Sequence, residues 1–124
     1  MIPYLKQRFA SFGYAFTGMI EVIRSQANPK IHLLAAILAI LGGWYLVIST
    51  VEWCLVILCI TSVLGAESLN TAIEYLTDLV SPKFHPLAKK TKDAAAAGVL
   101  WVAIGALAVG VIIFLPKLVA LLSS

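Results

Sequence analysis

Three long apolar runs divide the chain, at residues 31–49, 53–80 and 94–115. Each is close to or longer than the about 20 residues that an α-helix needs to cross the hydrocarbon core of a bilayer. The first run contains Trp44 and Tyr45 near its end, and both residue types favour the boundary between membrane and water. We therefore predict a single all-α membrane domain that covers the whole chain and has three transmembrane helices.

The segment before these runs has a different pattern. From Ile2 to Ile23, apolar side chains recur at alternating steps of three and four residues, which gives a stripe about 100° wide on a helix. The opposite side is polar, with Lys6 and Arg24 beside it. This pattern predicts an amphipathic helix over residues 2–25 that lies in the membrane interface. A helix packed on the other helices would explain the same pattern.

Basic residues predict how the chain is oriented. They precede the first and third apolar runs, and none lies between the first and second runs. Residues 81–93, SPKFHPLAKKTKD, hold two prolines and four lysines and are predicted to form the one substantial loop. Since basic loops stay on the cytoplasmic side, we expect the amino terminus and this loop to be cytoplasmic.

Composition supports a membrane protein and narrows its partners. The chain is 61% hydrophobic and 12% charged, whereas soluble domains are about 25% charged. This excludes an ordinary soluble fold. The net charge of +3 is small and diffuse, so no nucleic-acid partner is indicated.

One face of the second predicted span carries polar side chains at spacings of three, four and four, namely Glu67, Asn70, Glu74 and Asp78. An ionised acid near the bilayer centre costs about 2.5–3.5 kcal/mol, so these groups need partners, protonation or water, and by default mark a functional site. Clustered carboxylate and amide oxygens suit Mg²⁺. The alternative is that Asn70 and a protonated Glu67 only hydrogen-bond to neighbouring helices.

Groups suited to phosphate lie at the cytoplasmic end of this polar face. Lys92 and Asp93 are expected at the start of the third span, where free backbone N–H groups favour an anion. Asp93 equally fits the N-cap of that helix, and His85 in the loop equally fits a solvated side chain. The motifs of soluble phosphotransfer enzymes and hydrolases, such as GxxxxGK[ST] and HExxH, are absent. Any phosphate chemistry is therefore specific to membranes.

Residues 66–99, AESLNTAIEYLTDLVSPKFHPLAKKTKDAAAAGV, resemble the signature of the prokaryotic diacylglycerol kinase family of small trimeric membrane enzymes. The resemblance is closest to the branch that phosphorylates undecaprenol. It implies transfer of phosphate from ATP, with Mg²⁺ as cofactor, to undecaprenol or diacylglycerol at the cytoplasmic face of a bacterial inner membrane. It also implies a homotrimeric bundle with sites shared between neighbouring protomers.

The resemblance also assigns roles to single residues. Glu67 matches the proposed general base, Glu74 a metal-binding acid at the nucleotide, and Lys92 with Asp93 a nucleotide-contacting pair. The other positions that match nucleotide contacts are Tyr14, Lys83, Phe84 and His85, and the remaining signature positions are Asn70 and Asp78.

Gln26 departs from the family pattern, which usually has a second metal-binding glutamate at this position. An amide oxygen can bind Mg²⁺ but adds no negative charge. One alternative is therefore a catalytically impaired family member that acts as a membrane binding protein. Another is a small oligomeric proton-coupled transporter that uses the polar face of the second span as an ion path.

Overall fold

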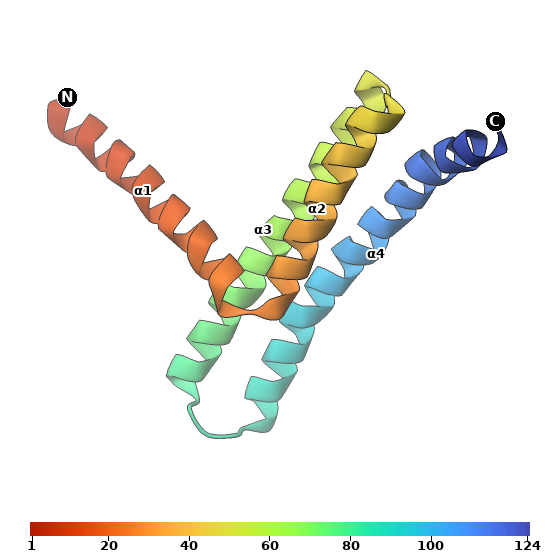
Figure 1. The fold of residues 1–124 in the computed structure, drawn as a ribbon. Coiled ribbons are helices and arrows are strands. Elements are labelled where there is room, and N and C mark those ends of the chain that lie inside the picture. Colours follow the sequence, from red (N-terminus) through yellow and green to blue (C-terminus); the bar gives the residue numbers. More distant parts are fainter.

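The structure, a computed structural model, describes all 124 residues and consists of helices joined by short connections, without strands (Figure 1). The helices are α1 (Ile2–Ser25), α2 (Ala27–Leu46), α3 (Thr50–Val80) and α4 (Pro86–Ser123). α2, α3 and α4 have 20, 31 and 38 residues and are long and apolar enough to cross a membrane. This confirms the predicted all-α membrane fold with three spanning helices.

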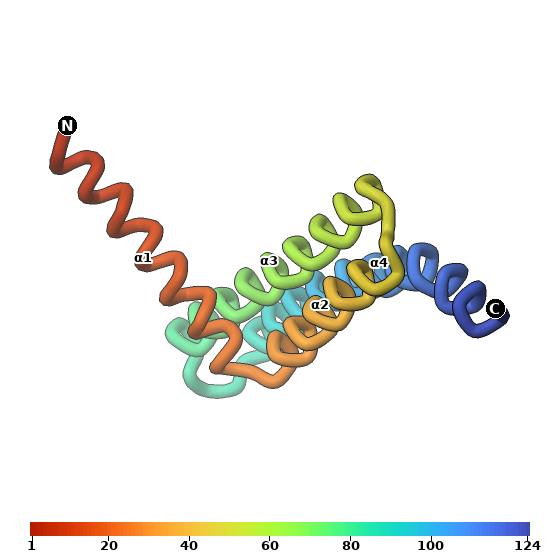
Figure 2. Tube along the Cα trace, turned by 45° about the horizontal axis from the view of Figure 1, so that its top comes forward, coloured from red at the N-terminus to blue at the C-terminus, as the bar shows by residue number.

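α2, α3 and α4 form a bundle that α1 leaves at a steep angle (Figures 1 and 2). The most extensive packing in the bundle is between α3 and α4. α1 buries none of its residues, and near its end the Tyr75 hydroxyl of α3 donates to the Glu21 carboxylate over 2.7 Å. The amphipathic helix is therefore present as predicted, while its position in the membrane interface stays a prediction.

Two short breaks set how the helices enter the bundle. At Gln26 the backbone is extended, with φ −140° and ψ 161°, and α2 begins at the next residue. Pro29 lies in the first turn of α2, where its missing N–H leaves no helical hydrogen bond unmade. At the other end of α2, in the connection to α3, Ser49 and Glu52 form a capping box that starts α3. Lys117 of α4 pairs with Glu52 over 3.2 Å, so the far ends of α3 and α4 are also linked.

The connection between α3 and α4 is shorter than the sequence predicts. α4 begins at Pro86 rather than at residue 94, so only residues 81–85 link the two helices. Proline suits the first helical position, and the His85 Nδ1 atom accepts a hydrogen bond from the Leu87 N–H over 3.1 Å. The prediction that Lys92 and Asp93 lie at the start of the third spanning helix is therefore wrong. The alternative in which Asp93 is the N-cap of that helix is also wrong, because the N-cap is His85.

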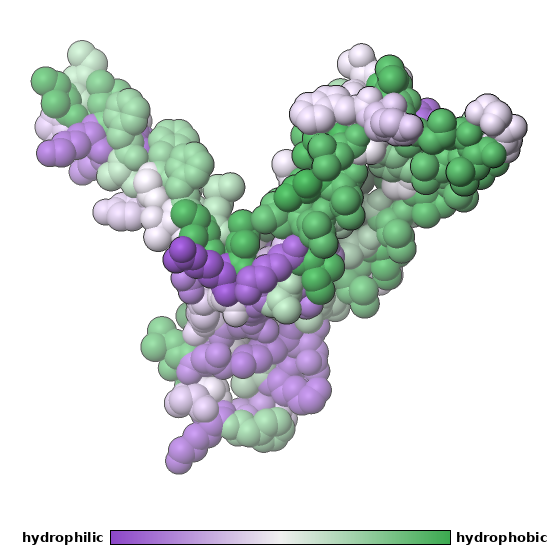
Figure 3. Space-filling model, in the orientation of Figure 1, coloured by the Kyte–Doolittle hydropathy of each residue, from purple (hydrophilic) through white to green (hydrophobic).

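The most hydrophilic residues gather at the end of the molecule that carries this short loop, whereas apolar residues cover most of the bundle above it (Figure 3). Only 12 of 124 residues are buried, and large apolar side chains on all three spanning helices are exposed. So much exposed apolar surface is stable only against lipid or other chains. The surface therefore agrees with the membrane protein that the sequence predicts.

Candidate functional site

The polar residues of α3 descend from the interior of the bundle to its hydrophilic end. Glu67 and Asn70 are buried, with 1% and 7% of their surface exposed. Glu74 is half-buried and Asp78 is exposed. The helical spacing predicts that these four residues share a face of α3. Glu67 lies against α2, and Asn70 lines a cavity between α2 and α4. Glu74 contacts Gln26, just before α2, and Asp78 contacts α4. The result is a path of polar groups that runs from the buried interior of the bundle to its exposed rim.

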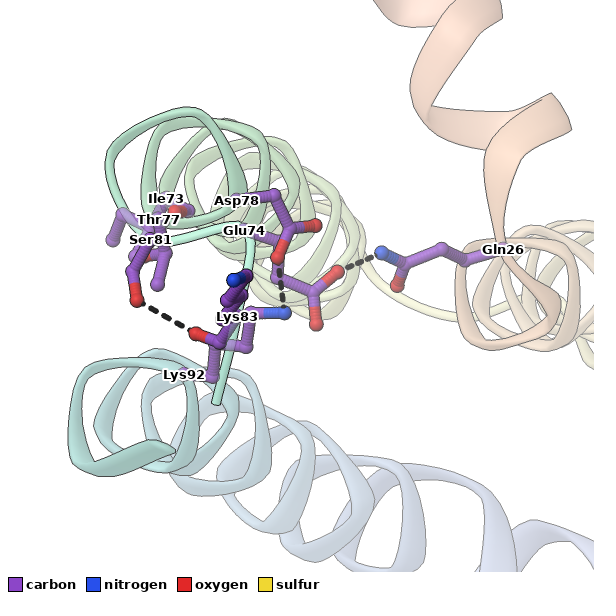
Figure 4. A network of polar contacts seen from close by, with 8 residues as sticks. All are labelled: Gln26, Ile73, Glu74, Thr77, Asp78, Ser81, Lys83 and Lys92. Atoms are coloured by element: carbon purple, nitrogen blue, oxygen red, sulfur yellow. Dashed lines mark hydrogen bonds and ion pairs between the residues drawn. The ribbon is translucent and has the colours of Figure 1, made fainter. Parts of the chain in front are cut away.

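In the middle of this path, Gln26 meets Glu74. The Gln26 Nε2 group donates a hydrogen bond to Oε2 of Glu74, although the two residues are 48 positions apart (Figure 4). The contact is possible because the extended backbone at Gln26 brings this side chain from the junction of α1 and α2 to the side of α3. The two residues that the sequence analysis assigns to metal binding are thus brought together.

At the rim, Asp78 pairs with Lys92. The Lys92 ammonium lies 2.6 Å from Oδ1 of Asp78, which joins the end of α3 to the second turn of α4 (Figure 4). Asp93 instead pairs with Lys89 on its own helix, also over 2.6 Å. Neighbouring residues on a helix point about 100° apart. Lys92 and Asp93, which the resemblance assigns to one nucleotide contact, therefore have different partners here.

The loop residues lie beside this rim. The Ser81 hydroxyl donates to the Lys83 carbonyl oxygen over 2.8 Å, and Figure 4 shows Lys83 between the end of α3 and Lys92. Phe84 is 81% exposed, and the His85 imidazole caps α4. The loop is therefore placed where it could contact an anion at the rim, and the nucleotide roles of its residues stay predictions.

Tyr14 is not part of this cluster. It lies in the middle of α1, which leads away from the bundle, and its side chain is 77% exposed. A contact between Tyr14 and a nucleotide at α3 thus needs either a movement of α1 or a second copy of the chain.

At the deep end of the path, Glu67 faces His32 of α2. The His32 Nε2 atom lies 3.2 Å from Oε1 of Glu67. No hydrogen-bond partner is present for either carboxylate oxygen of Glu67, for Oδ1 of Asn70 or for Oγ1 of Thr71. Since buried polar groups normally have partners, these atoms are positioned to receive a ligand or water. The sequence analysis missed His32, and the only signal was an ionisable side chain inside an apolar run.

Two cavities meet near Glu67. The smaller one, of about 260 Å³, is lined by polar residues of α2 and α3, including Asn28, His32, Glu67 and Asn70, and by small and apolar residues of α4. The larger one, of about 720 Å³, lies between α2, α3 and α4, and 17 of its 20 lining residues are hydrophobic. The arrangement can hold an apolar chain next to a carboxylate.

The donor set at Gln26 and Glu74 fits Mg²⁺ bound together with phosphate. No group of three or more histidine, cysteine or acidic side chains is placed to hold a metal by itself. Mg²⁺ commonly uses one or two protein oxygen ligands and completes its shell with phosphate oxygens and water. The Glu74 carboxylate and the Gln26 amide oxygen can supply these protein ligands. Asp78 is not counted among them, because it already pairs with Lys92.

Comparisons with known proteins identify the family of this chain. Residues 13–114 match the family described as prokaryotic diacylglycerol kinase. The undecaprenol kinase of Bacillus subtilis is 41% identical over 92% of this chain and 93% of its own length. The diacylglycerol kinase of Synechocystis is 36% identical over 90% of this chain and 65% of its own length. The diacylglycerol kinase of Helicobacter pylori strain 26695 is 38% identical over 77% of this chain and 74% of its own length.

Together with the three apolar helices, these matches define a membrane enzyme of the lipid kinase class. The chain belongs to the prokaryotic diacylglycerol kinase family, which confirms the resemblance found in residues 66–99.

Proposed function

We propose that the protein transfers the γ-phosphoryl group of ATP to the hydroxyl group of a membrane lipid alcohol. Undecaprenol is the first candidate and diacylglycerol the second, because the undecaprenol kinase has the higher identity and covers nearly all of both chains. The observation that carries the proposal is the path of polar groups from buried Glu67 to the Lys92 rim. It offers a base inside the apolar bundle and groups for phosphate at the water-exposed end.

The distance between the two acids fits a lipid acceptor. Glu67 and Glu74 are seven residues apart, about 10 Å along the helix axis. A hydroxyl group at Glu67 therefore lies deeper than phosphates near Glu74, as a lipid alcohol allows and a soluble sugar does not. Glu67 takes the hydroxyl proton while the new O–P bond forms, and the bond from the γ-phosphorus to the ADP oxygen breaks in line with it.

Gln26 and Glu74 would hold Mg²⁺, which when bound offsets the negative charge of the triphosphate. The Gln26 amide must turn to present its oxygen in place of the N–H that now donates to Glu74. Lys92, Asp93, Lys83, Phe84 and His85 are the proposed nucleotide contacts around this point. Lys92 contributes a positive charge, and its ion pair with Asp78 keeps the Lys92 ammonium beside the end of α3.

The proposal includes a homotrimer in the bacterial inner membrane with the amino terminus in the cytoplasm. Tyr14 is exposed on a helix that leaves its own bundle, which supports a nucleotide contact made in a neighbouring protomer. The lysines near the α3–α4 loop support the orientation. The transporter alternative would need polar access from both faces of the membrane, whereas the outer half of α3, from Trp53 to Ile60, has no charged residue.

The experiment is phosphate transfer by the purified protein in lipid vesicles, with γ-labelled ATP and Mg²⁺ and with undecaprenol, diacylglycerol or a short prenol as acceptor. We expect labelled undecaprenyl phosphate to form fastest. Faster labelling of diacylglycerol would reverse the order of substrates. No labelled lipid with any alcohol contradicts the proposal, and if nucleotide still binds, the catalytically impaired alternative is correct.

A further inference from the structure

His32 is the only ionisable side chain within ion-pairing distance of Glu67. Glu67 is 1% exposed, and neither of its carboxylate oxygens has a hydrogen-bond partner. A buried carboxylate without a partner is costly, and an unpaired ionised one is more costly still. An ionised Glu67 is therefore stable here only beside a group that offsets the negative charge of its carboxylate.

The amide of Gln26 and the ammonium of Lys92, which pair with the other acids of α3, do not reach Glu67. Gln26 donates to Glu74, and Lys92 pairs with Asp78. Those contacts are seven and eleven residues further along α3, about 10 and 16 Å from the level of Glu67. His32, from the second turn of α2, is the group that the fold brings to the deep end of the path.

His32 also lies where the two cavities meet. It lines both the polar pocket of about 260 Å³ and the apolar cavity of about 720 Å³. Among the 20 residues around the apolar cavity, it is the only one that is neither hydrophobic nor glycine. An apolar chain in the larger cavity would thus bring its polar end to His32 and Glu67.

We infer that His32 is a positioning residue for Glu67: its Nε2–H group holds Oε1 of Glu67 and leaves Oε2 to accept the proton of the lipid hydroxyl. The inference rests on the proposed function, in which Glu67 is the base. The present 3.2 Å contact is not aligned as a hydrogen bond. Such contacts in enzymes without substrate often tighten only when the substrate binds.

The test compares three variants at residue 32 with the wild-type protein in the vesicle assay. His32→Leu removes the donor, His32→Gln keeps an N–H at a similar reach, and His32→Asn keeps one at a shorter reach. We expect kcat to fall about 100-fold in His32→Leu, since a misplaced catalytic group costs about this much. The KM for ATP should stay within about threefold, because the nucleotide contacts are elsewhere. His32→Gln should recover to within about tenfold of the wild-type kcat.

Leu34→Ala is the matched control, because Leu34 lies on the same helix, is 58% exposed and lines neither cavity. It should keep the wild-type kcat. If His32→Leu is not stable, His32→Gln and His32→Asn decide the matter, and a higher kcat for Gln supports the inference. Equal rates in these two variants, a wild-type kcat in His32→Leu, or an equal loss of kcat and ATP binding would overturn it. A wild-type protein that labels no lipid would instead overturn the proposed function.

Discussion

At the residue scale, the charge of the proposed metal site depends on position 26. Gln26 contacts Glu74 and brings an amide where a carboxylate would add a negative charge. In the present contact the amide N–H occupies one Glu74 oxygen, so this group competes with a cation for the same atom. The site therefore has two oxygen donors but only one negative charge.

Gln26→Glu should lower the Mg²⁺ concentration that gives half-maximal kinase activity by about tenfold, because the number of charged ligands tunes the affinity for the ion. Titration of Mg²⁺ in the vesicle assay measures this. Gln26→Met, which lacks an oxygen ligand, should raise the same concentration. An identical Mg²⁺ dependence in wild type and Gln26→Glu would mean that residue 26 is not a metal ligand.

From the hydrophobic and polar pattern alone, single residues of the site could be predicted only where they repeat along a helix. Glu67 to Asp78 follow the helical period, so their common face was visible in the sequence. His32 is a single polar residue in an apolar run and has no such pattern. Its partner is 35 positions away, a contact that only the packing of α2 on α3 defines. Lys92 pairs with Asp78 of α3, whereas its neighbour Asp93 pairs with Lys89. The contact between Lys92 and Asp78 likewise depends on the packing of α4 on α3.

At the element scale, the close approach of α2 and α3 depends on Gly43. A Cβ atom at this position would lie 2.7 Å from the end of the Trp53 ring and 3.0 Å from Ile48. Gly42, one residue earlier, can accept a Cβ atom without a clash, since the nearest atom would be 3.6 Å away in Phe114, an ordinary van der Waals distance. The two glycines have the same helix propensity and different neighbours, so they form a matched pair.

Gly43→Ala should destabilise the protein by about 1–3 kcal/mol, the usual cost of overpacking a filled contact. Gly42→Ala should be neutral or stabilise it by up to about 1 kcal/mol, since alanine is the better helix former. Thermal unfolding in detergent compares both variants with wild type. Equal unfolding temperatures for the two variants would show that Trp53 can move aside and that the contact is not tight.

The helices could be predicted from the apolar runs, but their ends could not all be predicted. α1 covers Ile2–Ser25, the range that its amphipathic pattern predicts. α4 begins eight residues before its apolar run, because Pro86 and the His85 cap extend it through the lysine-rich segment. Hydropathy marks where a helix meets lipid, whereas capping and packing decide where it starts.

At the scale of the whole molecule, polar and apolar surfaces are separated along the bundle. The hydrophilic part of the bundle runs from the α3–α4 loop to the break between α1 and α2, and the opposite end holds the α2–α3 turn and the carboxyl terminus (Figures 1 and 3). This separation supports an orientation in which the hydrophilic end faces the cytoplasm, where ATP is present. The sequence predicts this arrangement through its lysines.

A membrane-impermeant thiol reagent tests the orientation after Cys54 and Cys59, the two native cysteines, are replaced by alanine. In intact cells, Ser124→Cys should be labelled and Lys90→Cys should be labelled only after the membrane is permeabilised. The reverse result would place the lysine loop outside and remove its access to cytoplasmic nucleotide.

The most direct test of the whole account is the isosteric change Glu67→Gln, measured for both nucleotide binding and lipid phosphorylation. We predict that ATP still binds and that kcat falls by about 10²–10⁴, the usual contribution of a positioned general base. Glu52→Gln, the same change in the first turn of α3, should keep the wild-type kcat. A Glu67→Gln protein that phosphorylates the lipid alcohol at the wild-type rate would contradict the account.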